Sequence, residues 1–339
     1  MSAPRILVIR RRYLGDIVLL GSLLRNLRLH WPDAHLAVAV EPRFAEVLAL
    51  NPDVNATLPL PARLGQWWGF LRTVRGSRFT HVLDLDNTEK TAAIARLSGA
   101  KTRVALHHGI HALKLRLAYT HVVHDPTESH ENRLIPDYYL LALQPLGVPV
   151  ATREIRLVPR AADLAAIRPL VGAAGRVLLV HPGSRSAMRI WPAERFAAVC
   201  DYAQDELGLQ VVLVGGPAEA ALVAEIKKHA RTHLLTPPGA LPIGRFAALA
   251  SLSDAFLCHD SGPMHVAAAV GTRVIALYGS QNIALFQPMG EGHTLLQPPL
   301  PCATCVAPER CVPADSYKNL CVRNIAVERV KAAVAAAIR

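Results

Sequence analysis

The stretch that decides the fold is residues 5–29, RILVIRRRYLGDIVLLGSLLRNLRL. The apolar run at residues 5–9 predicts a buried strand, and residues 17–29 predict a helix. A turn at Leu14-Gly15-Asp16 separates them. A buried strand that leads through a turn into a helix is typical of a parallel sheet covered by helices.

The same rhythm continues along the chain. Further strands are predicted at residues 36–40, 81–85 and 103–106, and helices at 42–50 and 90–97. A weakly patterned, proline-containing stretch from 145 to 159 indicates a linker. Beyond it we expect strands at 176–180, 210–214, 255–258 and 273–277, and helices at 192–207, 218–229, 264–270 and 327–338.

The predicted fold class is therefore α/β, with two Rossmann-like domains facing each other across a cleft. We expect an N-terminal domain at residues 1–155, a second domain at 156–325 and a C-terminal helix at 326–339. In open sheets of this kind, ligands bind beyond the carboxyl ends of the strands.

The composition is that of a packed globular protein, since 51% of the 339 residues are apolar and 19% are charged. No apolar run reaches the roughly 18 uncharged residues that a membrane span needs. The N-terminus lacks the pattern of a signal peptide. We therefore expect a cytoplasmic protein.

The net charge of +11 is concentrated near the N-terminus, because the first 120 residues hold 17 basic and 8 acidic side chains. Such a bias attracts phosphorylated substrates, acidic lipid headgroups or nucleic acid. A solvated basic face without any partner is the alternative. Aromatic residues are only 5% of the chain and no nucleic-acid module is visible, so we expect no nucleic-acid partner.

Three loops of the second half follow strands and lead into helices, at residues 181–189, 215–219 and 259–263. Backbone N–H groups at helix starts bind anions. Asp260 and Ser261 are residue types that cap helices, and Gly262 leaves the backbone open to a phosphate; Met264 and His265 follow directly. An ordinary capped helix start is the alternative interpretation.

The other two loops add charge and hydroxyl groups. Ser184, Arg185, Ser186 and Arg189 could hold a diphosphate and stabilise its leaving charge, or the arginines could simply lie on the surface. Glu219 could bind ribose hydroxyls, or it could be a first-turn glutamate favoured by the helix dipole.

In the first half, Asp16 follows the first strand. A carboxylate there could act as general base on an acceptor hydroxyl, or it could cap the helix that follows. Asp84 and Asp86 end another strand and are weaker candidates for binding the acceptor. No GxGxxG and no Walker lysine loop occurs, which disfavours a dehydrogenase or a nucleotide hydrolase.

Four cysteines cluster near the C-terminus with spacings that could form a metal site, and reduced thiols are the alternative. They are Cys302, Cys305, Cys311 and Cys321. A second candidate for a metal site, His107-His108-x2-His111, has no cysteine or carboxylate nearby and indicates a polar loop instead.

Together these segments resemble the bacterial ADP-heptose:lipopolysaccharide heptosyltransferases, glycosyltransferase family 9, which have a GT-B fold. The resemblance covers nearly the whole chain. Its segments are RYLGDIVL at 12–19, WPDA at 31–34, NPDV at 51–54, LSGA at 97–100, HPGSRSAMRIWP at 181–192, GGP at 215–217 and DSGPMHVAAA at 260–269.

The resemblance implies an inverting transfer that needs no cofactor for catalysis. It implies that Asp16 is the general base, with Arg12 and Gly15 beside it at the acceptor. It also implies that the loop at Ser184–Ser186 and the helix start at Asp260–Gly262 hold the diphosphate, and Glu219 the ribose. The family usually has lysine where Arg189 stands, and arginine keeps the charge with a larger, forked group.

The partners implied are an ADP-heptose donor, a lipopolysaccharide core acceptor and the inner face of the cytoplasmic membrane. The clustered cysteines are similar to those of many family members, which favours a structural zinc or iron over a catalytic one. A protein acceptor is one alternative. A nucleotide-sugar epimerase and a non-enzymatic basic binding protein are the rivals from other classes.

Overall fold

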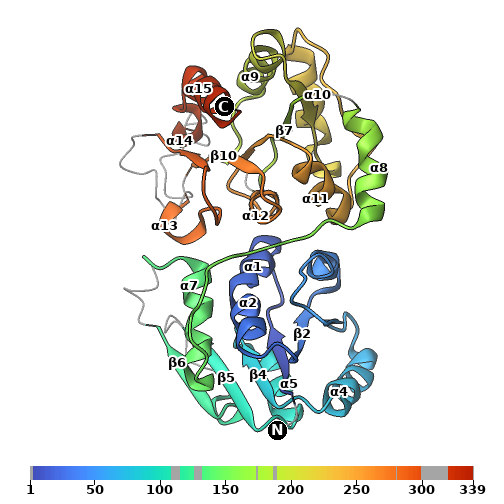
Figure 1. Cartoon of the computed structure of the whole chain (residues 1–339), viewed down its shortest axis with the longest axis vertical. Helices are drawn as coiled ribbons and strands as arrows, with labels where there is room; N and C mark the ends of the chain where they lie inside the picture. The colour runs from blue at the N-terminus through green and yellow to red at the C-terminus, as the bar shows by residue number, and fades with distance from the viewer. Residues whose placement is uncertain are drawn as a thin grey trace. The chain divides into compact units, whose positions relative to one another are not determined.

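The computed structural model describes residues 3–107, 115–125, 132–172, 175–185, 189–279, 281–298 and 320–338 (Figure 1). The chain forms two compact units, Met1–Arg156 and Leu157–Arg339. Each unit is built on its own parallel β-sheet, and each is described below by itself.

The first unit has a six-stranded sheet in the order β3-β2-β1-β4-β5-β6, with every neighbouring pair parallel. Four of the five residues of β1 are fully buried, because a parallel sheet carries helices on both faces. Its strands are β1 (Arg5–Ile9), β2 (His35–Val40), β3 (Ala56–Pro59), β4 (His81–Asp84), β5 (Thr102–His107) and β6 (His121–His124).

Helices and short 3-10 turns connect these parallel strands. The α-helices are α1 (Leu14–Leu19), α2 (Gly21–His30), α3 (Ala45–Leu48), α4 (Trp67–Gly76), α5 (Glu89–Leu97) and α7 (Ile135–Leu140). Short 3-10 turns are η1 (Pro42–Phe44), η2 (Leu64–Gln66), η3 (Arg116–Ala118) and η4 (Leu141–Leu146).

The second unit has a five-stranded parallel sheet in the order β11-β10-β9-β7-β8. Its strands are β7 (Val177–His181), β8 (Gln210–Leu213), β9 (Ala255–His259), β10 (Arg273–Leu277) and β11 (Thr294–Leu296). Its helices are α8 (Ala161–Val171), α9 (Ala193–Asp205), the 3-10 turn η6 (Pro217–Glu219), α10 (Ala220–His229), α11 (Ile243–Ser251), α12 (Gly262–Ala269), α13 (Ile283–Phe286), α14 (Leu320–Arg323) and α15 (Val327–Ala337).

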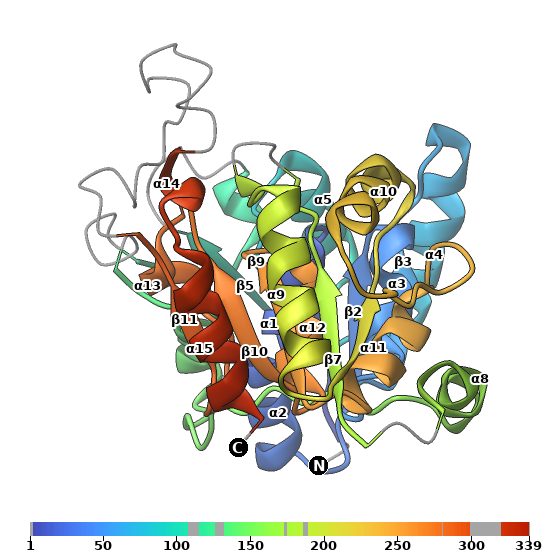
Figure 2. The same ribbon diagram turned by 90° about the horizontal axis from the view of Figure 1, so that it is seen from above.

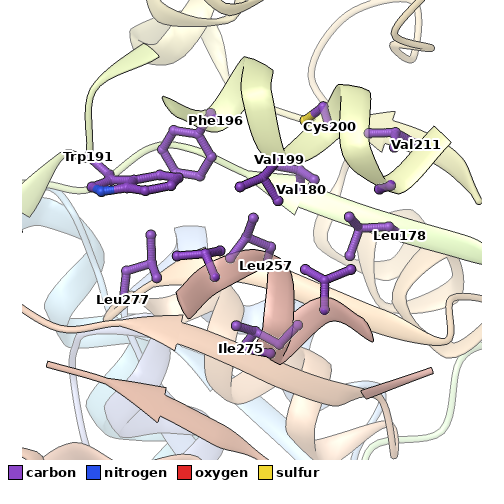
Figure 3. Close-up of a cluster of buried hydrophobic side chains, with 14 of the residues drawn as sticks. Leu178, Val180, Trp191, Phe196, Val199, Cys200, Val211, Leu257, Ile275 and Leu277 are labelled. Atoms are coloured by element: carbon purple, nitrogen blue, oxygen red, sulfur yellow. The ribbon is translucent and has the colours of Figure 1, made fainter. Parts of the chain in front are cut away.

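The C-terminal helix α15 packs against α9 and β10, so it belongs to the second unit. Figure 2 shows α9 and α15 side by side over one face of the second sheet. Figure 3 shows the core beneath α9, where Phe196 packs against Trp191 and Val199 points toward Leu257 of the sheet. A separate core in the first unit packs α4 and α5 against its sheet.

The predicted α/β class with two parallel sheets is confirmed, and the structure adds elements that the sequence did not indicate. The missed strands are β3, β6 and β11, and the missed helices include α4, α8 and α11. The helix predicted at 17–29 begins earlier, at Leu14, and consists of two segments, α1 and α2, that meet at Leu20. Within the described part of the chain, no helix is long and apolar enough to cross a membrane.

Candidate active site

In each unit, two neighbouring strands send their connections to opposite sides, which creates a switch point at the carboxyl edge of the sheet. In the first unit this point lies between β1 and β4, and in the second between β7 and β9. Ligands of doubly wound sheets bind at such points. Most of the predicted site residues follow the strands that flank these two switch points, and Glu219 follows β8, the neighbour of β7.

At the β1–β4 switch point, Asp16 occupies the first turn of α1 and receives three hydrogen bonds. Its Oδ1 accepts from Arg10 Nη2 at 2.6 Å and from the Tyr139 hydroxyl at 3.2 Å. Its Oδ2 accepts from the backbone N–H of Tyr13 at 2.8 Å, which caps the helix. The side chain keeps 15% of its surface exposed. The carboxylate is thus held in one orientation and still reaches solvent.

Arg10 connects Asp16 to a second carboxylate. Its Nη1 donates to Asp86 Oδ1 at 3.1 Å and to the Leu85 carbonyl oxygen at 3.1 Å. Arg11 donates to Asp86 Oδ2 from its backbone N–H at 2.6 Å and from Nε at 3.0 Å. Burial lowers the pKa of Arg10, but the neighbouring Tyr139, Asp16 and Asp86 outweigh burial and raise it well above its usual value. Arg10 is therefore a fixed cation between two carboxylates.

Asp84, a weak candidate for acceptor binding, lies in the interior with 0% exposure. It accepts hydrogen bonds from the Tyr119 hydroxyl at 2.6 Å and from the backbone N–H groups of Asp86 and Asn87 at 3.0 and 3.1 Å. Burial raises its pKa to about 6, although these hydrogen bonds lower it. Asp84 therefore shapes the turn that carries Asp86 and does not face a ligand.

The remaining candidates of this unit flank Asp16. Gly15 lies in the first turn of α1 and is half-buried. Arg12 is exposed, and its guanidinium carbon lies 5.1 Å from the centroid of the Tyr13 ring. Arg12 lies in the connection between β1 and α1, and Gly15 precedes Asp16 within α1.

At the β7–β9 switch point, two serine hydroxyls have no hydrogen-bond partner among the described residues. Ser184 follows β7, and Ser261 is the residue before α12, in an extended conformation. The Oγ atoms of both are buried. A buried hydroxyl without a partner costs free energy, so hydroxyls of this kind indicate a ligand that would accept their hydrogen bonds. Gly262 begins α12, and its backbone N–H lies at this helix start, ahead of Pro263, which has no N–H.

Charge at this edge comes from Asp260 and two arginines. Arg189 Nη1 lies 3.4 Å from Asp260 Oδ2, and the two side chains are 21% and 11% exposed. Burial raises the pKa of Asp260 to about 6, against the lowering effect of Arg189 and Arg185. Burial and the like charge of Arg185 lower the pKa of Arg189, which Asp260 partly offsets. Arg185 itself is exposed, and Ser186 lies outside the described residues.

Glu219 lies against two glycines at the ends of β7 and β8. Its Oε2 accepts from the Gly216 N–H at 2.8 Å. A Cβ atom added at Gly183 would lie 2.4 Å from Glu219 Cγ, and one added at Gly215 would lie 2.9 Å from its Cβ. The two glycines thus make room for the carboxylate, whose other oxygen is available for a ligand hydroxyl.

Three residues near α12 point inward. His259, expected in the loop, is the last residue of β9; it is fully buried, and its Nε2 accepts from the Trp191 N–H at 2.9 Å. Burial lowers the pKa of His259 to about 3. Met264 is also fully buried, beside the Tyr278 hydroxyl at 3.5 Å, and His265 is only 4% exposed. Met264 therefore stabilises the start of α12 by packing in the interior of the second unit.

Comparison with known proteins identifies the family. Residues 67–313 match the glycosyltransferase family 9 (heptosyltransferase) family model. The chain belongs to glycosyltransferase family 9, the heptosyltransferases. It is 26% identical over 292 residues to lipopolysaccharide heptosyltransferase 3 of Escherichia coli. The aligned region covers 82% of this chain and 84% of that protein.

Solved structures of family 9 proteins share this fold. A glycosyltransferase family 9 protein from Veillonella parvula DSM 2008 has a TM-score of 0.84 at 23% identity, over 100% of this chain and 98% of that one. E. coli ADP-heptose LPS heptosyltransferase II has a TM-score of 0.80 at 21% identity, over 98% of both chains. The predicted GT-B fold and glycosyltransferase class are therefore confirmed.

The structure of this family 9 chain also shows residues that sequence reasoning missed. Arg10 and Arg11 stand directly after β1, a position that signals ligand-edge residues once the strand is assigned. Tyr139 comes from α7, 123 positions from Asp16, and nothing in its local sequence indicates the contact. Among the described residues, no group of histidine, cysteine or acidic side chains could hold a metal ion. Cys302, Cys305 and Cys311 lie outside the described residues, as does the side chain of Cys321.

Proposed function

We propose that this chain transfers a heptose from ADP-heptose to a sugar hydroxyl of the lipopolysaccharide inner core, with inversion at the anomeric carbon. The observation that carries the proposal is the geometry of Asp16. Its carboxylate is partly exposed and is oriented by Arg10 and Tyr139 at the β1–β4 switch point. The names of the relatives, which include an ADP-heptose LPS heptosyltransferase, support the donor and the acceptor.

In the proposed reaction, Asp16 takes the proton of the acceptor hydroxyl while that oxygen forms a bond to the anomeric carbon of the heptose. The bond from the anomeric carbon to the diphosphate oxygen breaks, and ADP leaves with the electron pair. Arg189 and the Gly262 N–H at the start of α12 stabilise the charge on the leaving diphosphate. Ser184, Ser261 and Glu219 bind the donor. No cofactor takes part in these steps.

The test is a transfer assay with purified protein, ADP-heptose and core lipopolysaccharide from a strain that lacks heptosyl transfer. We expect ADP release that depends on the acceptor and an acceptor heavier by one heptose. NMR of the product should show the anomeric configuration opposite to that of the donor. Conversion of ADP-heptose without an acceptor would support the epimerase rival, and transfer only to a protein would support the other alternative.

We further propose that the protein works as a peripheral protein on the inner face of the cytoplasmic membrane, through η2 and α4. Leu64 is 89% exposed and Trp68 is 75% exposed, and the exposed Arg63 and Arg72 flank them. No acidic residue occurs from 54 to 83. Interfacial helices insert tryptophan and leucine while their arginines bind anionic headgroups, each basic residue contributing about 1 kcal/mol.

Sedimentation with vesicles tests this surface. We expect the protein to bind vesicles that contain phosphatidylglycerol and not pure phosphatidylcholine vesicles. The double variant Leu64→Ser/Trp68→Ser should lose most of this binding, whereas Leu29→Ser, at a residue of the same unit that is 46% exposed, should keep it. Equal binding by the double variant and the wild type would contradict the proposal.

The cysteine cluster is the remaining proposal. By their spacing, Cys302, Cys305, Cys311 and Cys321 would hold a structural zinc or iron. Metal analysis of the purified protein measures this directly: we expect about one metal ion per chain, and its loss in Cys302→Ser/Cys305→Ser. A metal-free wild-type protein would favour reduced thiols.

A further inference from the structure

A buried histidine, His259, ends β9 at the second switch point, and the proposed chemistry does not use it. Side chains alternate along a strand, so His259 points to the same face of the sheet as Ala255 and Leu257, the face that α9 covers. Its side chain has 0% exposure. A polar ring in such a core costs free energy unless it forms hydrogen bonds. A histidine at this position therefore needs partners that offset its burial.

One partner of His259 lies in the connection between β7 and α9. The Nε2 atom of His259 accepts a hydrogen bond from the backbone N–H of Trp191 at 2.9 Å. Trp191 is fully buried, and its own Nε1 donates to the Ile325 carbonyl oxygen at 3.1 Å. The rings of Trp191 and His259 both pack edge-on against Phe196 of α9, with centroid distances of 5.2 and 5.4 Å (Figure 3). The acceptor and the donor of this hydrogen bond are therefore both fixed by the core.

The imidazole ring is neutral and has a defined tautomer. Burial, followed by the like charge of His181, lowers the pKa of His259 to about 3. The backbone of Gly183 and Pro182 acts in the opposite direction and raises this pKa, so the ring lies against the loop that leads to Ser184. In a neutral imidazole one nitrogen accepts and the other carries the proton, so acceptance at Nε2 places the proton on Nδ1.

The hydrogen bond of His259 joins the same two segments as the ion pair of this switch point. Asp260 directly follows His259, and Arg189 stands two residues before Trp191. The ion pair is long, at 3.4 Å, and Arg189 keeps 21% of its side chain exposed, so the pair alone holds the two segments weakly. The Trp191 N–H is fully buried with its acceptor, and losing that acceptor would leave a buried donor unpaired. The buried hydrogen bond therefore sets the separation at which Arg189 and Asp260 face each other.

We infer that His259 is a positioning residue for the donor: by accepting the Trp191 N–H, it holds the loop that carries Arg189 in the arrangement that receives the diphosphate. This inference rests on the proposed function for the identity of the donor. His259 contacts no ligand in this assignment and acts through Arg189. Its effect is therefore on the binding of ADP, which can be measured without an acceptor and without transfer.

The experiment is a calorimetric titration of the full-length protein with ADP, using variants of His259. Glutamine carries its amide oxygen close to the place of the histidine Nε2, so His259→Gln can still accept from Trp191. Leucine has no acceptor but fits the apolar core, and asparagine is too short to reach Trp191. We expect His259→Leu and His259→Asn to raise the Kd for ADP about ten-fold and His259→Gln to stay within about two-fold of the wild type.

A double-mutant cycle separates positioning from a general loss of structure. Because His259 acts through Arg189, the double variant His259→Leu/Arg189→Ala should bind ADP no more weakly than Arg189→Ala alone. The matched control is Thr272→Val in the same unit, at the amino end of β10. It removes a buried hydrogen bond from Thr272 Oγ1 to the Ala250 carbonyl oxygen at 2.7 Å. This control should lower the melting temperature and leave the Kd for ADP unchanged.

The inference is overturned if His259→Leu binds ADP as tightly as the wild type or if His259→Gln binds as weakly as His259→Leu. It is also overturned if the loss of binding free energy in the double variant equals the sum of the two single losses. These outcomes leave the proposed transfer reaction standing. A failed transfer assay with the expected pattern of ADP affinities would instead count against the proposed function alone.

Discussion

The two switch points are built differently, although both lie at the carboxyl edge of a parallel sheet. At β1–β4, the charged groups satisfy one another in the order Arg11, Asp86, Arg10 and Asp16, at distances of 2.6 to 3.1 Å. At β7–β9, the ion pair of Arg189 with Asp260 is longer, at 3.4 Å, and two serine hydroxyls lack partners among the described residues.

This difference indicates a division of labour. A network whose members already bind one another holds a catalytic group in one orientation without help from a ligand. Groups that lack partners gain them only when a ligand arrives, and this favours binding. The first switch point therefore suits proton transfer, and the second suits the grip on a diphosphate.

The largest effect is expected at the first switch point. Asp16→Asn keeps the shape of the side chain but removes the base, so transfer should fall by about 10²–10⁴-fold. The affinity for ADP, measured by calorimetry, should not change. Asp33→Asn, at an exposed position of the same unit, is the control and should transfer normally. Wild-type transfer by Asp16→Asn would remove Asp16 from the mechanism.

The next effect concerns the second switch point. Arg189→Ala should raise the Kd for ADP about 10- to 100-fold, because a charged hydrogen bond to a phosphate contributes about 1.5–3 kcal/mol. Arg245→Ala, an exposed arginine of the same unit, should leave the Kd unchanged. If both variants bind ADP alike, Arg189 is a surface arginine, as the alternative interpretation of its loop holds.

A smaller effect on ADP binding is expected from the two serines at the second switch point. Ser184→Ala and Ser261→Ala should each weaken ADP binding about five- to ten-fold, since each removes one hydrogen bond donated by an uncharged hydroxyl. The stability of the free protein should stay the same or rise, because a buried group without a partner is removed.

The matched control is Ser98→Ala in the first unit. Its buried hydroxyl donates to the Ala95 carbonyl oxygen at 2.7 Å and accepts from the Ala100 N–H at 3.1 Å. This variant should lose stability and keep its ADP affinity. Loss of stability in Ser184→Ala or Ser261→Ala would mean that those hydroxyls are structural after all.

The strands that carry the site were predictable, but their neighbours in the sheet were not. The apolar runs at β1, β4, β7 and β9 each mark a buried parallel strand, and polar residues directly after them mark the ligand edge. The strand order β3-β2-β1-β4 places the switch point between β1 and β4. This order depends on long-range packing that local sequence patterns do not encode.

For individual side chains, too, some positions could be predicted from the sequence and others could not. Asp16 follows its strand closely, and its position could be predicted from the motif. His259 belongs to the strand and Asp84 turns inward, because strand ends are uncertain by a residue or two and each step reverses the direction of a side chain. Short strands such as β3, half-buried along its length, carried too little apolar signal to be recognised.

The smallest expected effect is a pH dependence of stability. Burial raises the pKa of Asp84 from 3.8 to about 6, so the folded state holds a proton that the unfolded state releases between these values. The contribution of Asp84 to stability therefore falls as the pH rises from about 4 to 6 and is constant above.

Asp84→Asn removes this dependence. Relative to the variant, the wild type should melt higher at pH 4 than at pH 7, by roughly 2–4 °C for each kcal/mol. Tyr119→Phe should do the reverse of Asp84→Asn. It removes the hydrogen bond that most strongly lowers the pKa of Asp84, so the fall in stability should continue to higher pH. A wild type and an Asp84→Asn variant whose melting curves shift in parallel with pH would contradict the assignment.

Two of the hydrophobic cores have a consequence for how such enzymes diversify. Among the described residues, the core under α9 draws on residues beyond Leu157, and the core under α4 and α5 draws on residues before Arg156. Each half is also continuous in sequence. A recombination event at this junction would exchange whole units while leaving these two cores intact. We expect a chimera that joins residues 1–156 to the second half of a relative with another sugar nucleotide to take its donor preference from that second half.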